Sequence, residues 1–331
     1  MTTRIHRVSR DRPGFTRRRQ GRGFAYLDRR GRTIADPHVL ARIRTLSIPP
    51  AWTDVWICPD PNGHLQATGV DDAGRRQYLY HEAWRARQDR AKHARVERIA
   101  ERLPALRARV ARDLRADGYP RSRVLACAVR LLDRGPFRIG SEAYATANGS
   151  FGLATMRKEH VSIANGTATF DFVGKSGKRH RMAISDRGVV PILRGLRRRD
   201  DGRELLAWRD GNGWRDVRSE DINGYLRDVV GEDVTAKDFR TWRATVLCAA
   251  LLAEHAGAAS RRRTVTAVVR EVAEHLGNTP AVCRASYIDP RVIDRFLDRE
   301  ETIDVTWHVD GRPERVPPRV ERSVLRLLRG E

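Results

Sequence analysis

The spacing of apolar residues changes along the chain, and this change constrains the fold more than any other feature of the sequence. Over residues 24–80, short apolar stretches such as DVWIC stand beside turns, and QYLYH alternates apolar with polar residues; both are typical of β-strands. From His81 onward the period becomes 3.6, which predicts amphipathic helices over 82–103, 106–118 and 121–135. The sequence thus favours two segments of different structural class.

We therefore predict an α+β protein. A basic segment over 1–23 (TRRRQGRG) is expected to be a flexible arm, 24–88 a small β-rich domain, and 89–331 a larger, mostly helical domain. Further helices are predicted over 189–199, 219–230, 235–257, 264–277 and 279–288.

One small sheet is predicted inside the helical part. Residues 159–164, 167–173 and 179–184 alternate, and Asn165-Gly166 and a Gly-rich tip join them into a three-stranded antiparallel meander. The tip, VGKSG, resembles the end of a phosphate-binding P-loop. A P-loop needs a glycine five positions before Gly174, and Thr169 stands there. Lys175 is therefore expected on a hairpin turn, with no nucleotide site.

The charge of the chain points to a polyanionic partner. Sixty-four Lys and Arg face forty-two Asp and Glu, a formal net charge of +22. Nucleic acid fits an excess that recurs along the whole length. An anionic membrane surface is the alternative, but it would favour one basic amphipathic helix or a basic block beside an apolar span.

Residue spacing argues against metals, disulfides and membrane spans. The four cysteines stand singly, no His/Cys spacing suits zinc, and no apolar run reaches the ~18 residues of a transmembrane helix. His275, close to a predicted helix end, is expected to act as a cation there. The N-terminus lacks an apolar secretory segment, so we expect a cytoplasmic, nucleoid-associated protein. From the residue spacing we also expect neither a metal ion nor a cofactor.

Four segments carry residues suited to phosphoryl transfer. They are GPFRIG with Arg138, the hairpin tip with Lys175, KDFRTW with Arg240, and LGNTPAVCRASY with Asn278 and Tyr287. Such chemistry needs a nucleophile, guanidinium groups that hold the non-bridging oxygens, and an acid for the departing oxygen. These side chains can supply all three without a metal ion.

Helix signals position two of these segments. Thr235 and Asp238 have the spacing of a capping box ahead of Arg240. Gly277 ends one predicted helix, Thr279 can cap the next, and Pro280 suits its first turn.

In this order the segments resemble the type IB DNA topoisomerases, in the short poxvirus-like form found in bacteria. The resemblance extends from LSIPPAW (46–52) and GRRQYLY (74–80) through FRIG, FVGK, KDFR and LGNTP to CRASY. It implies a monomeric clamp on double-stranded DNA that relaxes supercoils by nicking and resealing one strand, without ATP.

The resemblance also implies roles for individual residues. Tyr287 would form a 3′-phosphotyrosyl bond, Arg138 and Arg240 would hold the scissile phosphate, and Lys175 would be the general acid to the 5′ oxygen. Asn278 stands where many members carry a histidine that donates to a non-bridging oxygen; asparagine can donate but cannot carry a proton. Residues that relatives use to touch DNA match Gln77, Tyr78, Tyr144 and Lys237.

Two other functions remain open at this point. A tyrosine recombinase uses a similar Arg–Lys–Arg–Tyr order, although it usually carries a helical bundle where this chain is strand-like. A non-enzymatic basic DNA-binding protein would explain the charge, but would have no use for a tyrosine nine residues after Asn278.

Overall fold

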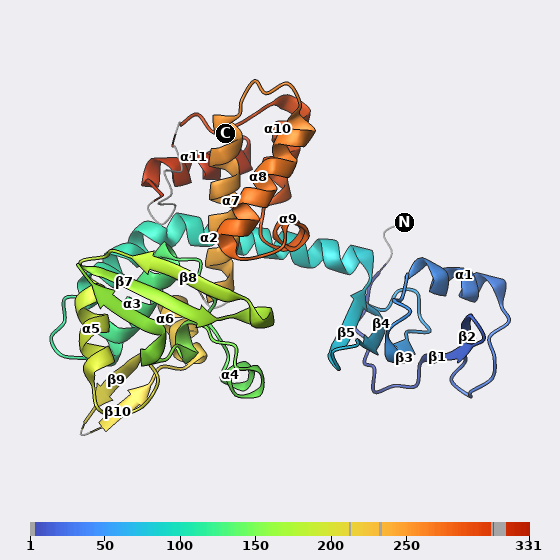
Figure 1. The fold of residues 1–331 in the computed structure, drawn as a ribbon. Helices are drawn as coiled ribbons and strands as arrows, with labels where there is room; N and C mark the ends of the chain where they lie inside the picture. The colour runs from blue at the N-terminus through green and yellow to red at the C-terminus, as the bar shows by residue number, and fades with distance from the viewer. Residues whose placement is uncertain (1–3, 212, 232–233, 306, 308–315) are drawn as a thin grey trace. The chain divides into compact units, whose positions relative to one another are not determined.

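The computed structural model describes residues 4–331, apart from 212, 232–233, 306 and 308–315 and the side chains of 143–144. The chain divides into two compact units, Met1–Lys92 and His93–Glu331, and Figure 1 shows the elements of each. The predicted α+β class is confirmed: the first unit is built on an antiparallel sheet, and the second is mostly helical with a small three-stranded sheet.

The first unit contains a five-stranded sheet in the order β2-β1-β3-β4-β5, with all neighbours antiparallel. A helix, α1, contributes Ile43 to a small core that also contains Val55, Ile57 and Ala67. The elements are β1 (Phe15–Gln20), β2 (Gly23–Leu27), α1 (Pro37–Thr45), β3 (Thr53–Ile57), β4 (Leu65–Val70) and β5 (Arg76–Tyr80).

Strand β1 lies within the segment that the sequence had suggested was a flexible arm. Its Arg17 donates to the carbonyl oxygens of Ile48, Pro49 and Trp52, and its guanidinium lies 4.1 Å from the ring centroid of Phe24. The arginine-rich segment therefore forms a strand, because backbone carbonyls distant in the sequence accept hydrogen bonds from Arg17.

The second unit is built around α7, which is buried at every residue from Asp238 to Leu252. Helices α3, α6, α8, α10 and α11 pack against it. Its helices are α3 (Arg121–Arg134), α4 (Glu142–Asn148), α5 (Val190–Arg198), α6 (Ser219–Val230), α7 (Ala236–Glu254), α8 (Arg261–Leu276), α9 (Pro280–Ser286), α10 (Pro290–Arg299) and α11 (Pro318–Arg329).

Helix α2 (Glu82–Asp113) begins in the first unit and ends in the second. The sequence predicted two helices here, but one helix continues through Pro104. Residues Val96, Ile99, Leu103, Leu106 and Val110 are buried at alternating spacings of three and four. This apolar stripe on both sides of the proline offsets the one hydrogen bond that proline removes.

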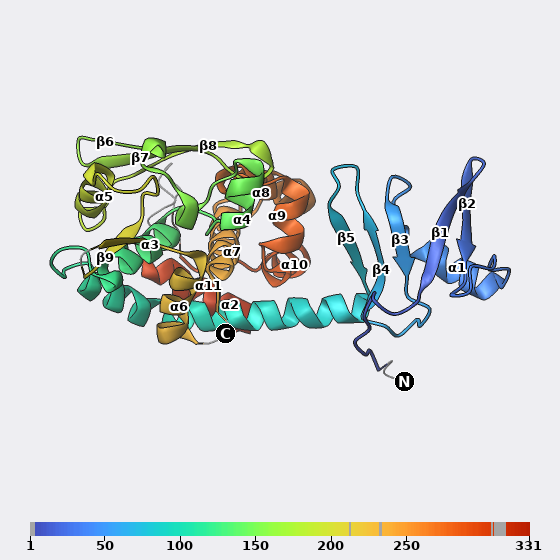
Figure 2. The same cartoon turned by 90° about the horizontal axis from the view of Figure 1, so that it is seen from below.

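The predicted meander is present as β6 (Val161–Ala164), β7 (Thr167–Val173) and β8 (Arg179–Ile184), paired in that order. Helix α5 packs along β6 and β7, as Figure 2 shows. A two-stranded ribbon, β9 (Ala207–Asp210) and β10 (Gly213–Asp216), was not anticipated. None of the helices described is both long and apolar enough to cross a lipid bilayer.

Candidate active site

Arg138 follows α3 on a segment whose backbone is closely fixed. Gly135 ends the helix, and a Cβ there would lie 2.4 Å from Cε2 of Phe137, a fully buried ring. Beyond Arg138, Gly140 has a φ of +87° and packs against Gly152 so closely that neither position has room for a Cβ. The carbonyl oxygen of Arg138 accepts a hydrogen bond of 2.8 Å from the N–H of Leu153. Arg138 therefore has little freedom in its backbone.

Arg240 lies near the start of α7. As predicted, Asp238 closes the N-terminus of this helix: its carboxylate accepts from the backbone N–H and the hydroxyl of Thr235, at 3.0 and 2.9 Å. Arg240 is buried and donates to the carbonyl oxygens of Pro136 and Leu276, the latter over 2.7 Å. Its guanidinium thus ties the segment before Arg138 to the last turn of α8.

Asn278 and Tyr287 flank α9. Gly277 ends α8 in the left-handed conformation, with a φ of 65°, and Thr279 caps α9 by accepting from the N–H of Val282. Pro280 occupies the first turn, as predicted. Tyr287 follows the last residue of α9 and is 7% exposed. The two caps turn the chain so that both side chains face Arg138.

Four of the five predicted catalytic residues converge. Nη1 of Arg138 donates to the hydroxyl of Tyr287 over 3.1 Å, and its Nη2 donates to Oδ1 of Asn278 over 2.5 Å. Cζ of Arg240 lies 5.4 Å from the centroid of the Tyr287 ring. Since Oδ1 of Asn278 accepts from Arg138, its Nδ2 is left as a buried donor without a partner in the described structure. The cluster thus offers unused donors beside a tyrosine hydroxyl.

The surrounding charge favours the phenolate. Burial alone raises the pKa of Tyr287, but the charges of Arg138 and Arg240, the Arg138 hydrogen bond and the charge of Lys237 outweigh it. The pKa of Tyr287 therefore lies below that of an ordinary tyrosine. Burial, aided by the charge of Arg138, lowers the pKa of Arg240 to about 10, so Arg240 stays positively charged at neutral pH.

Lys175 stands apart from this cluster. It is exposed on the turn between β7 and β8, as predicted, and makes no hydrogen bond or ion pair with any described residue. The structure thus brings together Arg138, Arg240, Asn278 and Tyr287, and leaves Lys175 free on its hairpin.

His180 connects the hairpin to the cluster, a role that sequence reasoning did not assign. A Cβ on Gly174 would lie 2.6 Å from its Cδ2, and a Cβ on Gly277 would lie 2.4 Å from its Cε1. The ring also stacks on Phe172, with centroids 5.5 Å apart. His180 therefore fills the space between the hairpin and the end of α8. Gly174 and Gly277, which leave room for its ring, are the sequence features that could have indicated this contact.

The predicted charge on His275 is wrong. Burial, followed by the charges of Arg243 and Arg240, lowers the pKa of His275 to about 4. The imidazole is neutral at pH 7 because it is buried and because Arg243 and Arg240 of α7 add positive charge near it.

The residues expected to touch DNA have varied settings. On β5, Gln77 donates to Asp71 over 2.8 Å, whereas Tyr78 is 47% exposed and stacks on Tyr80. Lys237 is exposed on the first turn of α7 and contributes to the field at Tyr287. Tyr144 lies in α4, and its side chain is outside the part of the chain that the structure describes.

A cavity of about 1060 Å³ lies elsewhere in the second unit, and Phe239, Trp242 and Arg243 of α7 line part of it. None of the five candidate residues lines this cavity. The candidate site is therefore identified by the contacts among Arg138, Arg240, Asn278 and Tyr287, not by a cavity.

Two protein families match the chain. Residues 81–305 match the family described as "Eukaryotic DNA topoisomerase I, catalytic core", and residues 23–71 match "Bacterial DNA topoisomerase IB, N-terminal domain". The first match contains all five candidate catalytic residues, whereas Gln77 and Tyr78 fall between the two.

The chain is also similar to a viral protein. It is 30% identical over 303 residues to the protein named DNA topoisomerase 1B of Acanthamoeba polyphaga mimivirus, and the alignment covers 87% of this chain and 89% of the relative. The resemblance noted in the sequence is confirmed. The chain belongs to the type IB DNA topoisomerases, in the short form, and is an isomerase that acts on DNA.

Proposed function

We propose that the protein relaxes supercoiled DNA by nicking one strand through Tyr287, without ATP or a metal ion. The observation that carries this proposal is the hydrogen bond of 3.1 Å from Arg138 to the Tyr287 hydroxyl, beside the buried amide of Asn278, which has no partner among the described residues. A nucleophile and its anion-binding donors therefore meet at one point.

In the first step, the Tyr287 oxygen attacks the phosphorus of a DNA backbone phosphate. The phenol proton passes to solvent, and the positive field of the two arginines supports the phenolate. A bond forms between the tyrosine oxygen and phosphorus, while the bond from phosphorus to the 5′ oxygen breaks. The 3′ end of the nicked strand stays on the enzyme.

The non-bridging oxygens gain negative charge in this transition state, and three side chains are suited to hold them. Arg138 and Arg240 each retain N–H groups beyond the contacts described above. Asn278 contributes its Nδ2. Donors held ready in a partly buried site stabilise developing charge without reorganisation.

The departing 5′ oxygen needs a proton, and Lys175 is the proposed acid. Lys175 is exposed and has no hydrogen-bond or ion-pair partner among the residues that the structure describes, so its ammonium is available to a bound substrate. Contact between the hairpin and Gly277 through His180 supports a tip that reaches the scissile phosphate.

Religation is the reverse reaction. The 5′-hydroxyl attacks the phosphotyrosine after torsion in the DNA has rotated the free end, and one phosphate ester replaces another, so no ATP is consumed. We further propose that the protein acts as a monomer on chromosomal DNA in the cytoplasm. Gln77, Tyr78, Tyr144 and Lys237 are its proposed DNA contacts.

Strand exchange, the reaction of tyrosine recombinases, is the second candidate activity, because it would use the same cluster. The match of residues 23–71 to a topoisomerase N-terminal domain favours relaxation. Incubation with two recombination-type sites and absence of strand exchange would separate the two functions.

Trapping the covalent intermediate tests the proposed linkage. Plasmid DNA arrested with SDS during reaction should carry protein on nicked strands, and the free ends should accept label from polynucleotide kinase without phosphatase treatment, since they bear 5′-hydroxyls. Ends that polymerase extends instead would carry 3′-hydroxyls and contradict the 3′-phosphotyrosyl bond.

A further inference from the structure

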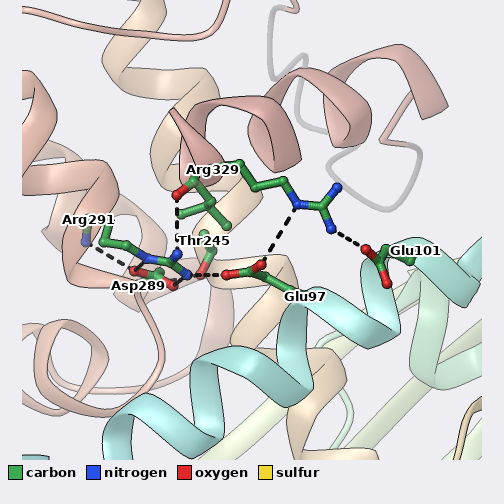
Figure 3. A network of polar contacts seen from close by, with 7 residues as sticks. Glu97, Glu101, Thr245, Asp289, Arg291 and Arg329 are labelled. Atoms are coloured by element: carbon green, nitrogen blue, oxygen red, sulfur yellow. Dashed lines mark hydrogen bonds and ion pairs between the residues drawn. The ribbon is translucent and has the colours of Figure 1, made fainter. Parts of the chain in front are cut away.

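The side chain of Tyr287 is held by Arg138, but its backbone is held by a separate polar network. Figure 3 shows this network, which links the start of α10 to α2, α7 and α11. None of its members belongs to the catalytic cluster.

The network begins at Thr245, a fully buried residue of α7. Its Oγ1 accepts a hydrogen bond of 3.1 Å from the N–H of Asp289. The same oxygen lies 3.4 Å from the carbonyl oxygen of Tyr287 and 2.9 Å from that of Thr241. Thr245 thus contacts the chain on both sides of Ile288 and fixes the segment that presents the nucleophile.

The second member is Asp289, which is 1% exposed and caps α10. A buried carboxylate is costly unless it is paired. Its partner is Arg291, which donates from Nε to Oδ1 over 3.1 Å and from Nη2 to Oδ2 over 2.8 Å. The segment after Tyr287 therefore depends on where Arg291 lies.

Arg291 in turn is held from two other helices. Its Nη1 donates to the carbonyl oxygen of Leu328 in α11 over 3.1 Å, and its Nη2 donates to Glu97 of α2 over 2.6 Å. The hydrogen bond with Asp289, supported by Glu97, raises the pKa of Arg291, so its charge is permanent. Arg291 is the point at which α2, α10 and α11 meet, as Figure 3 shows.

Helix α2 is the element that passes from one unit into the other, and exposed Arg85, Arg87 and Arg90 lie on its first part. Exposed arginines are the side chains that DNA phosphates attract. A contact made on α2 can therefore reach Asp289 through the Glu97–Arg291 pair.

We propose that Glu97 and Arg291 are positioning residues that couple α2 to the Tyr287 backbone, through Asp289 and Thr245. This inference rests on the proposed nicking reaction. The pair sets the rate of attack by Tyr287 and leaves DNA affinity and protonation of the leaving group unchanged.

The test is single-turnover cleavage of saturating DNA by Glu97→Gln, which removes the charge and keeps the shape. We expect the rate constant to fall ~10-fold, because small displacements of a nucleophile have large kinetic effects. The DNA dissociation constant and the melting temperature should stay near wild type. Glu101→Gln is the matched control: Glu101 lies one turn later on α2 and pairs with Arg329, which is itself 3.9 Å from Glu97, but not with Arg291 or Asp289 among the contacts of Figure 3.

Two further experiments show whether attack by Tyr287 or protonation of the leaving group is impaired, and whether Thr245 carries the coupling. A substrate with a 5′-phosphorothiolate leaving group should not rescue Glu97→Gln, because that variant is impaired in attack. Thr245→Val should be impaired and Thr245→Ser should recover, and Glu97→Gln combined with Thr245→Val should lose less than the product of both effects, as expected for coupled residues.

The outcomes separate the two proposals. If wild-type protein forms no covalent complex, the nicking function itself is wrong. If wild-type protein cleaves and Glu97→Gln cleaves as fast as Glu101→Gln, or if its loss follows DNA affinity or melting temperature, the coupling is wrong while the nicking function stands.

Discussion

Arg138 donates a hydrogen bond of 3.1 Å to the hydroxyl of Tyr287, although 149 positions separate them in the sequence. The arginine comes from the segment after α3 and the tyrosine from the end of α9. In the proposed reaction, this guanidinium contacts the nucleophile before substrate arrives and then binds the phosphate that the nucleophile attacks. Four predictions concern this bond and the residues around the candidate site.

Replacing Arg138 should change the ionisation of the tyrosine. The pKa of Tyr287 is below the ordinary value because positive charges outweigh the effect of burial. Arg138→Ala removes one charge and one hydrogen bond to the phenolate, so this pKa should rise. Absorbance titration of DNA-free protein at 295 nm, as the difference between each protein and its Tyr287→Phe counterpart, measures it. Arg121→Ala, which removes an exposed arginine paired with Asp221, is the control and should not shift it.

Removing the Lys175 ammonium should slow cleavage by ~10²–10⁴, the usual contribution of a general acid. A 5′-phosphorothiolate substrate should restore the Lys175→Ala enzyme, since a thiolate leaves without a proton. Lys178→Ala, on the same exposed turn, should cleave both substrates like the wild type. Failure of the thiolate to rescue would remove Lys175 from the acid role.

The position of Asn278 should require a donor. Asn278→His should keep cleavage within about tenfold of wild type, because an imidazole N–H replaces the amide as donor. Asn278→Asp should lose ~10²-fold or more, since a carboxylate offers no donor and repels the phosphate. Single-turnover cleavage by the two variants is the measurement. An aspartate variant as active as the histidine variant would show that a donor at this position is unnecessary.

The contact between His180 and Gly277 should be visible through glycine substitutions. Gly277→Ala adds a Cβ 2.4 Å from the imidazole at a φ of +65°, whereas Gly166→Ala adds one in open space at a φ of +73°. Both should lose roughly 1 kcal/mol of stability from the backbone conformation. Gly277→Ala should in addition clash with His180, lose further stability and slow cleavage. His180→Ala in the same chain should relieve the clash and recover that further loss of stability. Equal cleavage by the two alanine variants would argue against the contact.

Local signals in the sequence predicted much of the second unit. The caps formed by Asp238 and Thr279 and the helix end at Gly277 depend on neighbouring residues, and the structure has all of them. The Asn165-Gly166 turn likewise predicted the meander. Such features need no knowledge of distant partners.

Other features could not be read locally. Strand β1 looked like a charged arm because the carbonyl partners of Arg17 lie about thirty residues away in the sequence. Helix α1 carried a signal that was missed: Asp36 caps it, and Pro37 opens its first turn. The sequence predicted separate helices up to residue 103 and from residue 106, but burial of Leu103 and Leu106 on either side of Pro104 keeps α2 continuous.

In the candidate site, too, local patterns and contacts between distant residues have to be distinguished. Each of its residues, taken alone, has an ordinary structural explanation, and only the order of the motifs in a known family predicted that they meet. His180 and Arg291 were not predicted, because their importance comes from contacts with Gly277 and with Glu97 that no local pattern shows.

Whether Tyr287 nicks the DNA is tested by relaxing supercoiled plasmid in EDTA, without ATP, with the wild type and with Tyr287→Phe. The wild type should remove supercoils, while Tyr287→Phe should bind DNA equally well and leave every supercoil in place. Relaxation by both proteins would contradict Tyr287 as the nucleophile. Failure of both, with DNA binding intact, would contradict metal-free relaxation itself.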